Sequence, residues 1–219
     1  PRMIIRNSPL RLLNPGPVTL SPRVRQALSG PDLCHRQPEF GELQQAVRGA
    51  LAAVYPQAAH DYEAVLLTGS GRAKEAIDVL KRGLILAPES PMLRTVLSLT
   101  RLYAGELPEA RAEIGKALSS AGEDPFVRVI YAMILARSGD KDAALGEVTL
   151  RVEPYAGNIA SLHVSIAAVY ALLGRNGTAV ESLEKALSFG TIDYPWLSFD
   201  PNFDGLRQDP RFQDCMKRL

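Results

Sequence analysis

Gly105-Glu106-Leu107-Pro108-Glu109-Ala110 is the stretch that decides the organisation of this 219-residue chain, because it recurs along the sequence. Its copies are Gly139-Asp140-Lys141-Asp142-Ala143-Ala144 and Gly174-Arg175-Asn176-Gly177-Thr178-Ala179, and a weaker copy, Gly71-Arg72-Ala73-Lys74-Glu75-Ala76, precedes it. The alanines that end successive copies lie 34, 34 and 35 residues apart. Self-similarity at this period is typical of helical repeat arrays.

Each copy also places residues of a fixed kind at fixed distances from its first glycine. A small residue stands five positions on, a large apolar residue four further, and a second small residue three beyond that. Arg151 alone breaks the last position, so we expect the third hairpin to pack most loosely. The four sets are Gly71, Ala76, Leu80 and Gly83; Gly105, Ala110, Ile114 and Ala117; Gly139, Ala144, Val148 and Arg151; and Gly174, Ala179, Leu183 and Ala186.

This length and pattern resemble the tetratricopeptide repeat over residues 72–187. The resemblance implies an all-α fold, a right-handed superhelical array of antiparallel helix pairs, in which stability comes from stacking neighbours. We assign residues 61–190 to about three and a half such repeats. Apolar periodicity and the positions of proline and glycine predict helices over residues 72–86, 91–104, 108–119, 125–137, 141–152, 159–173 and 176–188.

The composition argues against several classes of function. A formal net charge of +1 gives little attraction to nucleic acid or an anionic membrane, and no apolar run is long enough to span a bilayer. Pro1–Arg6 does not have the apolar core and cleavage site of a secretory signal. Cys34 and Cys215 are far apart in sequence and are expected to be reduced thiols. These features predict a cytoplasmic protein without nucleic-acid or membrane partners.

The first third of the chain has a different character. Its sequence predicts a short helix over residues 21–28 and an amphipathic helix over 40–55. The motifs Leu13–Val18, Pro31–Arg36 and Ala64–Gly71 resemble, in order and spacing, the start of class V aminotransferases of the 2-aminoethylphosphonate–pyruvate transaminase type. We therefore assign residues 1–60 to a partly irregular, aminotransferase-like segment.

The aminotransferase resemblance implies that Thr68, Gly69, Ser70 and Gly71 would hold the phosphate of pyridoxal 5'-phosphate at a helix N-terminus. The pattern breaks at Arg72, where the repeat begins, and no lysine stands in the family's context for the cofactor lysine. The alternative to a repeat protein is therefore an inactive fragment of such an enzyme. Residues 63–68 fit either a buried strand or the end of a repeat helix, and stacking favours a helix from about Asp61 to Leu67.

Residues 191–219 are rich in aromatic and turn-forming residues. They resemble the segments that close repeat arrays in bacterial signalling proteins with kinase or cyclase domains. We expect them to cap the array, because the terminal unit of a stack needs its apolar face covered. The residues expected to cover that face are Trp196, Leu197, Phe199, Phe203, Leu206 and Phe212.

The repeat register places the first helix of each pair on the concave face of the array. Arg137 is nearly the only charged residue there, which favours an amphipathic helix or an extended apolar peptide as partner. The chain's own N-terminal segment and a second copy of the chain are equally open as occupants. The sequence predicts a non-catalytic scaffold for protein–protein interaction, without a cofactor or a metal site. The predicted groove consists of Met92, Thr95, Leu99, Leu102, Tyr103, Phe126, Val129, Met133, Arg137 and Val164.

Overall fold

The computed structural model describes residues 56–190 and 194–218, which belong to one compact unit spanning residues 51–219. The described residues contain helices and no strand. The helices expected over residues 21–28 and 40–55, and the two N-terminal aminotransferase-like motifs, lie outside the described residues. The structure therefore tests the predictions for the repeats and for the tail.

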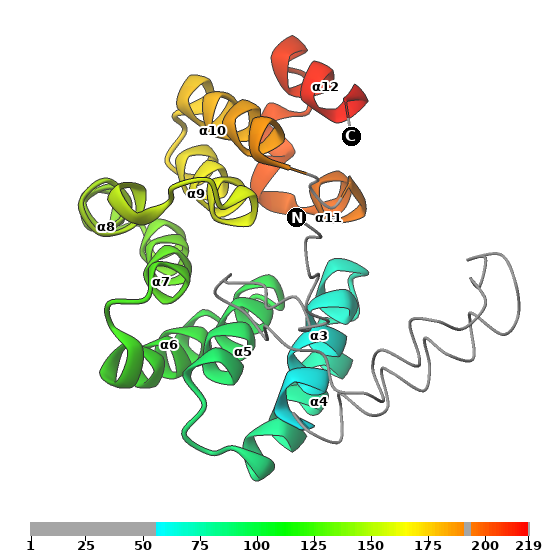
Figure 1. Cartoon of the computed structure of the whole chain (residues 1–219), viewed down its shortest axis with the longest axis vertical. Helices are drawn as coiled ribbons and strands as arrows, with labels where there is room; N and C mark the ends of the chain where they lie inside the picture. Colours follow the sequence, from blue (N-terminus) through cyan, green and yellow to red (C-terminus); the bar gives the residue numbers. More distant parts are fainter. Residues whose placement is uncertain (1–55, 191–193, 219) are drawn as a thin grey trace, which may run out of the picture. The chain divides into compact units, whose positions relative to one another are not determined.

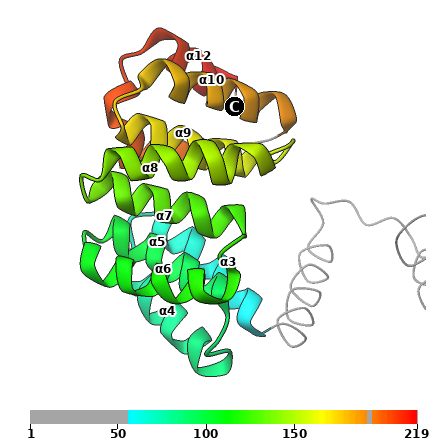
Figure 2. The same cartoon turned by 90° about the vertical axis from the view of Figure 1, so that its left-hand side faces the viewer.

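Eight helical segments form four antiparallel pairs (Figure 1). The first helices of the pairs also pack against one another along the array, so they form one layer, and the pairs stack in succession (Figure 2). The predicted helices are confirmed to within two residues at either end, except that the α-helix expected over residues 141–152 ends at Glu147 and continues as a π-helical turn. The helix expected before Arg72 is present. The pairs are α3 (Pro56–Gly69) with α4 (Ala73–Leu86), α5 (Pro91–Tyr103) with α6 (Leu107–Ala121), α7 (Pro125–Arg137) with α8 (Lys141–Glu147) and its extension, and α9 (Ala160–Leu172) with α10 (Asn176–Phe189).

The turn glycines end the first helix of every pair in the same way. Gly71, Gly105, Gly139 and Gly174 have φ between 74° and 86°, the left-handed region that glycine enters without steric cost. The residue after each glycine donates its N–H to a carbonyl five residues back, as Arg72 does to Leu67 at 2.8 Å and Glu106 to Arg101 at 2.9 Å. These bonds satisfy carbonyls that the helix end leaves open. The repeated glycine is therefore a helix terminator.

A second repeated position joins the first helices α5, α7 and α9 to the loops before them. Arg94 donates to the carbonyl of Pro88 at 2.6 Å, Arg128 to that of Gly122, and His163 Nε2 lies 3.0 Å from the carbonyl of Gly157. Each partner is six residues earlier in the chain. The two arginines also pair with a glutamate of the following helix, Arg94 with Glu113 at 2.9 Å and Arg128 with Glu147 at 3.2 Å. We call Arg94, Arg128 and His163 the loop-binding position.

The third pair departs from the others where Arg151 interrupts the pattern. After α8 the chain continues as a π-helical turn, η1 (Val148–Val152), and a 3₁₀ turn, η2 (Glu153–Tyr155). Val152 takes the inward place and is fully buried, while Arg151 is exposed. A π turn holds one residue more than an α turn, which matches the 35-residue spacing that follows. The break in the pattern at Arg151 thus coincides with a local change of helix type, and looser packing of this hairpin stays a prediction.

The tail forms three short helices, α11 (Tyr194–Phe199), η3 (Pro201–Leu206) and α12 (Pro210–Lys217). Segment η3 packs against α9, and α12 packs against α10. Leu197, Phe203, Leu206 and Phe212 are at most 2% exposed and belong to the same apolar core as the last two pairs. Phe199 does not cover this face as predicted, because its side chain is 73% exposed. The side chain of Trp196 lies outside what the structure describes.

Candidate functional site

The ten residues of the predicted groove fall into two groups. Half are at most 9% exposed, so their side chains pack in the interior and offer little surface: Thr95, Leu102, Val129, Met133 and Val164. The others, Met92, Leu99, Tyr103, Phe126 and Arg137, keep part of their surface accessible. That any of them contacts a partner stays a prediction. The predicted groove therefore offers less accessible surface than the repeat register implied.

Two groove residues, Tyr103 and Arg137, bind the tail. They occupy the same repeat position, the last residue of α5 and of α7, 34 residues apart. Arg137 donates to the side-chain oxygen of Asn202 at 2.8 Å, and the nitrogen of the same amide donates to the hydroxyl of Tyr103 at 3.0 Å. Asn202 is 5% exposed, so both halves of its amide are satisfied as burial requires. The tail is therefore fixed to the second and third pairs by one side chain.

Asp200 sets the electrostatics beside this contact. Its carboxylate caps η3 by accepting the N–H of Asn202 at 2.8 Å. The pKa of Tyr103 is raised well above 10, first by burial and then by the negative charge of Asp200 and a hydrogen bond to its carboxylate. Arg137 and the hydrogen bond with Asn202 act in the opposite direction. Tyr103 therefore stays a neutral phenol throughout the physiological range.

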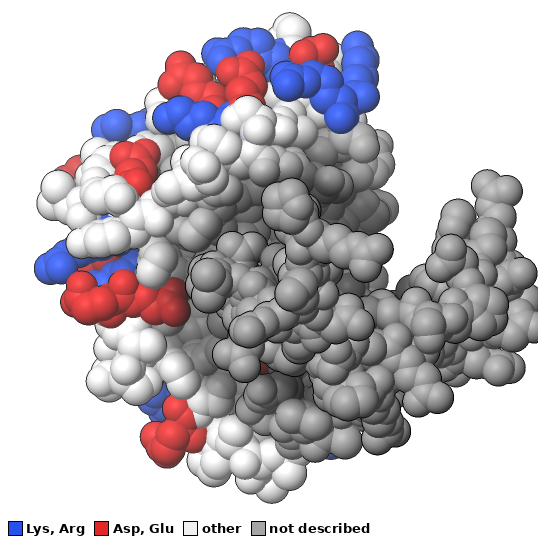
Figure 3. Space-filling view, viewed as in Figure 1, with Lys and Arg blue, Asp and Glu red and all other residues white. Residues whose placement is uncertain are grey.

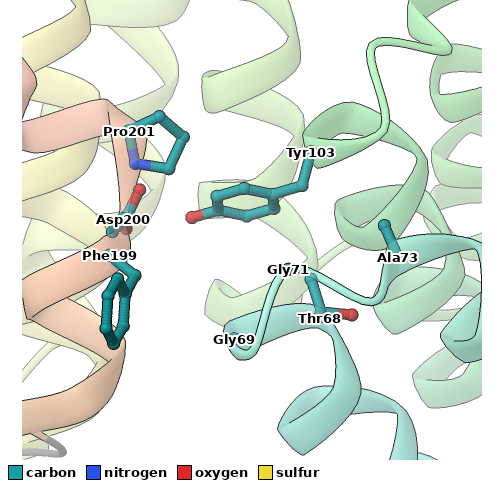
Figure 4. A pocket seen from close by; sticks show the side chains of 8 residues that line it. All are labelled: Thr68, Gly69, Gly71, Ala73, Tyr103, Phe199, Asp200 and Pro201. Carbon is teal, nitrogen blue, oxygen red and sulfur yellow. The ribbon is translucent and has the colours of Figure 1, made fainter.

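A pocket opens between the first pair and the tail (Figure 4). It holds about 540 Å³ of empty space, including its open side. One wall comes from the turn between α3 and α4, another from the ring of Tyr103, and a third from the junction of α11 and η3. In Figure 4 the Tyr103 hydroxyl points toward Asp200 and Pro201. The lining residues are Thr68, Gly69, Gly71, Ala73, Tyr103, Phe199, Asp200 and Pro201.

The pocket includes three of the four residues of the predicted phosphate cradle, but their structural setting is not a strand, turn and helix. Thr68 and Gly69 are the last residues of helix α3, so the helical interpretation of residues 61–67 is confirmed and the strand is excluded. The Thr68 hydroxyl donates to the carbonyl of Ala64 at 2.7 Å and lies 3.0 Å from the hydroxyl of Thr100. The Ser70 hydroxyl donates to the carbonyl of Leu67 at 3.0 Å. These hydroxyls serve the end of α3, and binding of pyridoxal phosphate stays an untested prediction.

The pocket lining contains no lysine. All six lysines of the chain are exposed. A lysine that forms an internal aldimine needs to reach the cofactor in its cleft. The six are Lys74, Lys81, Lys116, Lys141, Lys185 and Lys217.

Sequence analysis missed the part of the pocket that the tail provides. It predicted Tyr103 from the repeat register and named Thr68, Gly69 and Gly71 for another reason. It did not find Asp200 or Pro201 of the pocket, or Asn202 beside it. A signal was present, because an aspartate before a proline is a frequent start of a helical turn, and Asp200-Pro201 begins η3. That signal predicts a cap and does not show which helices it faces.

Within residues 56–190 and 194–218, no helix combines the length and apolar character needed to cross a membrane. Nor do His, Cys, Asp and Glu side chains gather there in a group of three that could bind a metal ion.

The chain resembles known proteins in structure and not in sequence. No protein-family model and no curated protein sequence matches the chain. TTC0263, a thermophilic TPR protein from Thermus thermophilus, aligns over 74% of this chain and 87% of its own, with 21% identity and a TM-score of 0.53. The fold is an all-α, tetratricopeptide-like helical array.

Other solved structures match more weakly. A MamA RS-1 double mutant aligns over 74% of this chain and 93% of its own at 14% identity, with a TM-score of 0.42. YrrB, described as a TPR protein with an unusual peptide-binding site, covers 64% of this chain and 89% of its own at 17% identity, with a TM-score of 0.31. These scores are too low to support an argument. The TPR-like assignment therefore rests on the first structure and on the geometry of the repeats.

Proposed function

We propose that this chain is a non-catalytic scaffold that binds a protein partner, and that a peptide of the partner enters the pocket between the first pair and the tail. The supporting observation is an open pocket on a TPR-like array. The pocket lies at the end of a row of equivalent positions in the first helices, and two residues of this row already bind the tail. Tyr103 and Arg137 bind Asn202 in this row, and the pocket lies over the preceding residue of the row, Gly69. A partner segment would extend the same mode of contact.

The tail itself is a lasting part of this site. Leu197, Phe203, Leu206 and Phe212 are almost wholly buried, and burying each such side chain contributes about 1.5–3 kcal/mol. Displacing the tail would return these four side chains to water, so we expect a peptide to bind beside the tail and not in its place. With the tail in place, the pocket and not the whole predicted groove is the proposed binding surface.

The polar atoms of the pocket favour binding over catalysis. The Thr68 hydroxyl donates to a main-chain carbonyl, Tyr103 accepts from Asn202, and Asp200 caps η3. Each of these groups has a structural hydrogen bond, and the pKa of Tyr103 is shifted away from the range of a general base. The same lining suits a surface that recognises a side chain by shape and charge.

A peptide selection tests the proposal. A displayed library of random peptides is selected on the full chain, and the enriched peptides are titrated into the purified protein. The variant Ala73→Phe fills the pocket from the start of α4, and Ala112→Phe makes the same change on the exposed face of α6. We expect enriched peptides to bind the chain and its Ala112→Phe variant equally, and to lose about tenfold or more in affinity with Ala73→Phe. Equal binding to both variants would place the contact elsewhere and reject the pocket.

A further inference from the structure

Two aromatic rings line the same pocket from separate walls. The ring of Tyr103 belongs to the last residue of α5, and the ring of Phe199 belongs to the last residue of α11 (Figure 4). Phe199 is 73% exposed, whereas Leu197 and Phe203 beside it in the tail are at most 2% exposed. Removing apolar surface from water is favourable. A side chain bound in the pocket would therefore gain free energy by covering Phe199.

The wall on the other side of the open space is mainly backbone. In Figure 4 the turn that carries Gly69 and Gly71 lies across this space from Phe199. The two glycines contribute no side chain, and Ala73 contributes one methyl group. Pro201 adds an apolar ring at the junction of α11 and η3. The space opposite Phe199 is therefore open to a bulky side chain.

The polar side chains of the pocket already have hydrogen-bond partners. The Thr68 hydroxyl donates to the carbonyl of Ala64 at 2.7 Å. The Tyr103 hydroxyl accepts from Asn202 and is hydrogen-bonded to the carboxylate of Asp200. Asp200 is 5% exposed and also caps η3. A polar group that left water for this pocket would find these atoms engaged, which is costly. The lining therefore favours a side chain that ends in an apolar group.

The charges around the pocket argue against an acidic occupant. Asp200 carries the only charged side chain among the eight lining residues, and its carboxylate would repel another carboxylate. Most of the Lys, Arg, Asp and Glu side chains visible on this face lie along the outer edge of the repeats (Figure 3). Charged residues of a partner would find ion-pair partners along that edge, and the pocket favours an uncharged residue.

From these observations, and on the basis of the proposed function, we infer that the pocket binds an aromatic side chain of the partner protein, with its ring against Phe199 and Tyr103. Aromatic pairs attract one another by more than the area they bury, and aromatic residues are frequent anchors of protein interfaces. Aliphatic and basic side chains are the competing occupants. The experiment below distinguishes the three.

The experiment titrates end-blocked five-residue peptides into the isotope-labelled full chain and follows the amide NMR signals of Gly69 and Gly71. The peptides have phenylalanine, cyclohexylalanine or arginine at the centre and glycine elsewhere. Cyclohexylalanine has a ring of similar size without π electrons, so it separates aromatic contact from burial of apolar area. A phenylalanine ring bound beside the turn also displaces the glycine signals through its ring current.

The variant Phe199→Leu removes the aromatic ring and keeps an apolar side chain at an exposed position. Phe189→Leu makes the same change at a 41% exposed residue of α10 that is not part of the lining, and it serves as control. We expect the phenylalanine peptide to bind the parent chain and Phe189→Leu equally, and to bind Phe199→Leu about threefold or more weakly. The cyclohexylalanine peptide should not distinguish the three proteins. The arginine peptide should leave both glycine signals in place.

Four results would overturn the inference. Failure of the phenylalanine peptide to move the glycine signals excludes the aromatic side chain, and equal binding to the parent chain and Phe199→Leu excludes the ring of Phe199. An equal loss for the phenylalanine and cyclohexylalanine peptides with Phe199→Leu identifies a purely apolar anchor. An arginine peptide that binds as well as the phenylalanine peptide identifies a basic one.

Two controls concern occupants from the protein itself. Glycine signals that move on dilution of the free chain would identify a second copy as the occupant. Phe40 and Tyr55 are the Phe and Tyr residues of the first 55 positions. Glycine signals that move when both are replaced by leucine would identify the chain's own N-terminal segment. Either result rejects a side chain of a partner.

The library selection separates failure of this inference from failure of the proposed function. Selected peptides without aromatic residues that still lose affinity with Ala73→Phe leave the scaffold standing and reject only the aromatic anchor. Selected peptides that Ala73→Phe does not affect reject the pocket itself.

Discussion

At the scale of single residues, the loop-binding position shows how a repeat can preserve an interaction while its residue type changes. Arg94, Arg128 and His163 lie 34 and 35 residues apart and each contacts a carbonyl six residues earlier. The sequence pattern did not predict this position. That pattern was defined by small and apolar residues, whereas this position carries two different polar residue types. The signal that could have found it is the combination of the period with a long donor side chain. Its contribution to stability can be measured directly.

Replacing Arg128 with alanine should destabilise the fold by about 2 kcal/mol, because Glu147 and the Gly122 carbonyl lose their shared donor. Both charged side chains are less than 20% exposed, so water replaces the lost contacts only in part. Urea unfolding followed by circular dichroism measures the change. Arg111→Ala, on the exposed face of α6, is the control and should change stability by less than about 0.5 kcal/mol. Equal effects of the two substitutions would show that the loop contact has no special role.

Glu113 predicts how stability depends on pH. Burial raises its pKa, but hydrogen bonds from Lys116 and Arg94 outweigh burial, and the net shift is downward. Its folded pKa is thus below its unfolded value of about 4.3, so Glu113 contributes stability above that value and loses it as pH falls through the folded pKa.

The measurement is urea unfolding of the parent chain and Glu113→Gln at pH 7, 5 and 3. The stability difference between them should be largest at pH 7 and should shrink by pH 3. Glu89→Gln, at an exposed turn carboxylate, provides the comparison. A difference that is constant over this range would contradict the predicted stabilisation by ionised Glu113.

At the scale of helices and turns, the helices begin and end where the local sequence predicts. Helices α5 and α7 begin with a side-chain cap followed by proline, Ser90-Pro91 and Asp124-Pro125, and each first helix ends at a left-handed glycine. The π turn at Val148–Val152 is the exception that a strict period could not describe. There the chain keeps a valine inward and turns the arginine outward, because burying an unpaired charge costs more than a change of helix type.

A matched pair of glycines in the second repeat tests the difference between turn and helix. Gly105 has φ of 79°, whereas Gly115 lies inside α6, and an added Cβ meets nothing within 4 Å at either site. Gly105→Ala should destabilise by about 1–2 kcal/mol from backbone strain alone. Gly115→Ala should stabilise by about 0.5–1 kcal/mol through helix propensity. Thermal unfolding of the two variants gives the sign, and a shift in the same direction for both would refute this account.

At the scale of the whole described unit, the tail contacts helices of all four pairs. It packs on α9 and α10, binds Tyr103 and Arg137 through Asn202, and reaches α3. The core that holds Phe203 and Phe212, whose ring centroids are 5.9 Å apart, also contains residues of the third and fourth pairs. Loss of tail packing should therefore weaken the array as a whole.

Phe203→Ala should lower the free energy of unfolding by about 3–5 kcal/mol, because it empties a site that is fully buried. Phe199→Ala, four residues earlier and 73% exposed, should change it by less than about 0.5 kcal/mol. Fluorescence of the single tryptophan, Trp196, reports on the tail, and circular dichroism reports on all helices. The two signals should change together in urea. Separate transitions would mean that the tail folds independently of the repeats.

The sequence alone determined the period, the turn glycines and most helix boundaries. These depend on caps, backbone preferences and apolar spacing within about one repeat of chain, so they can be predicted without coordinates. Tertiary structure decided which surface stays open. The contacts that fix the tail beside the pocket join Asn202 to residues 65 and 99 positions away, and no local pattern specifies them. They arise because stacked repeats curve and bring the tail beside helices that are distant in sequence.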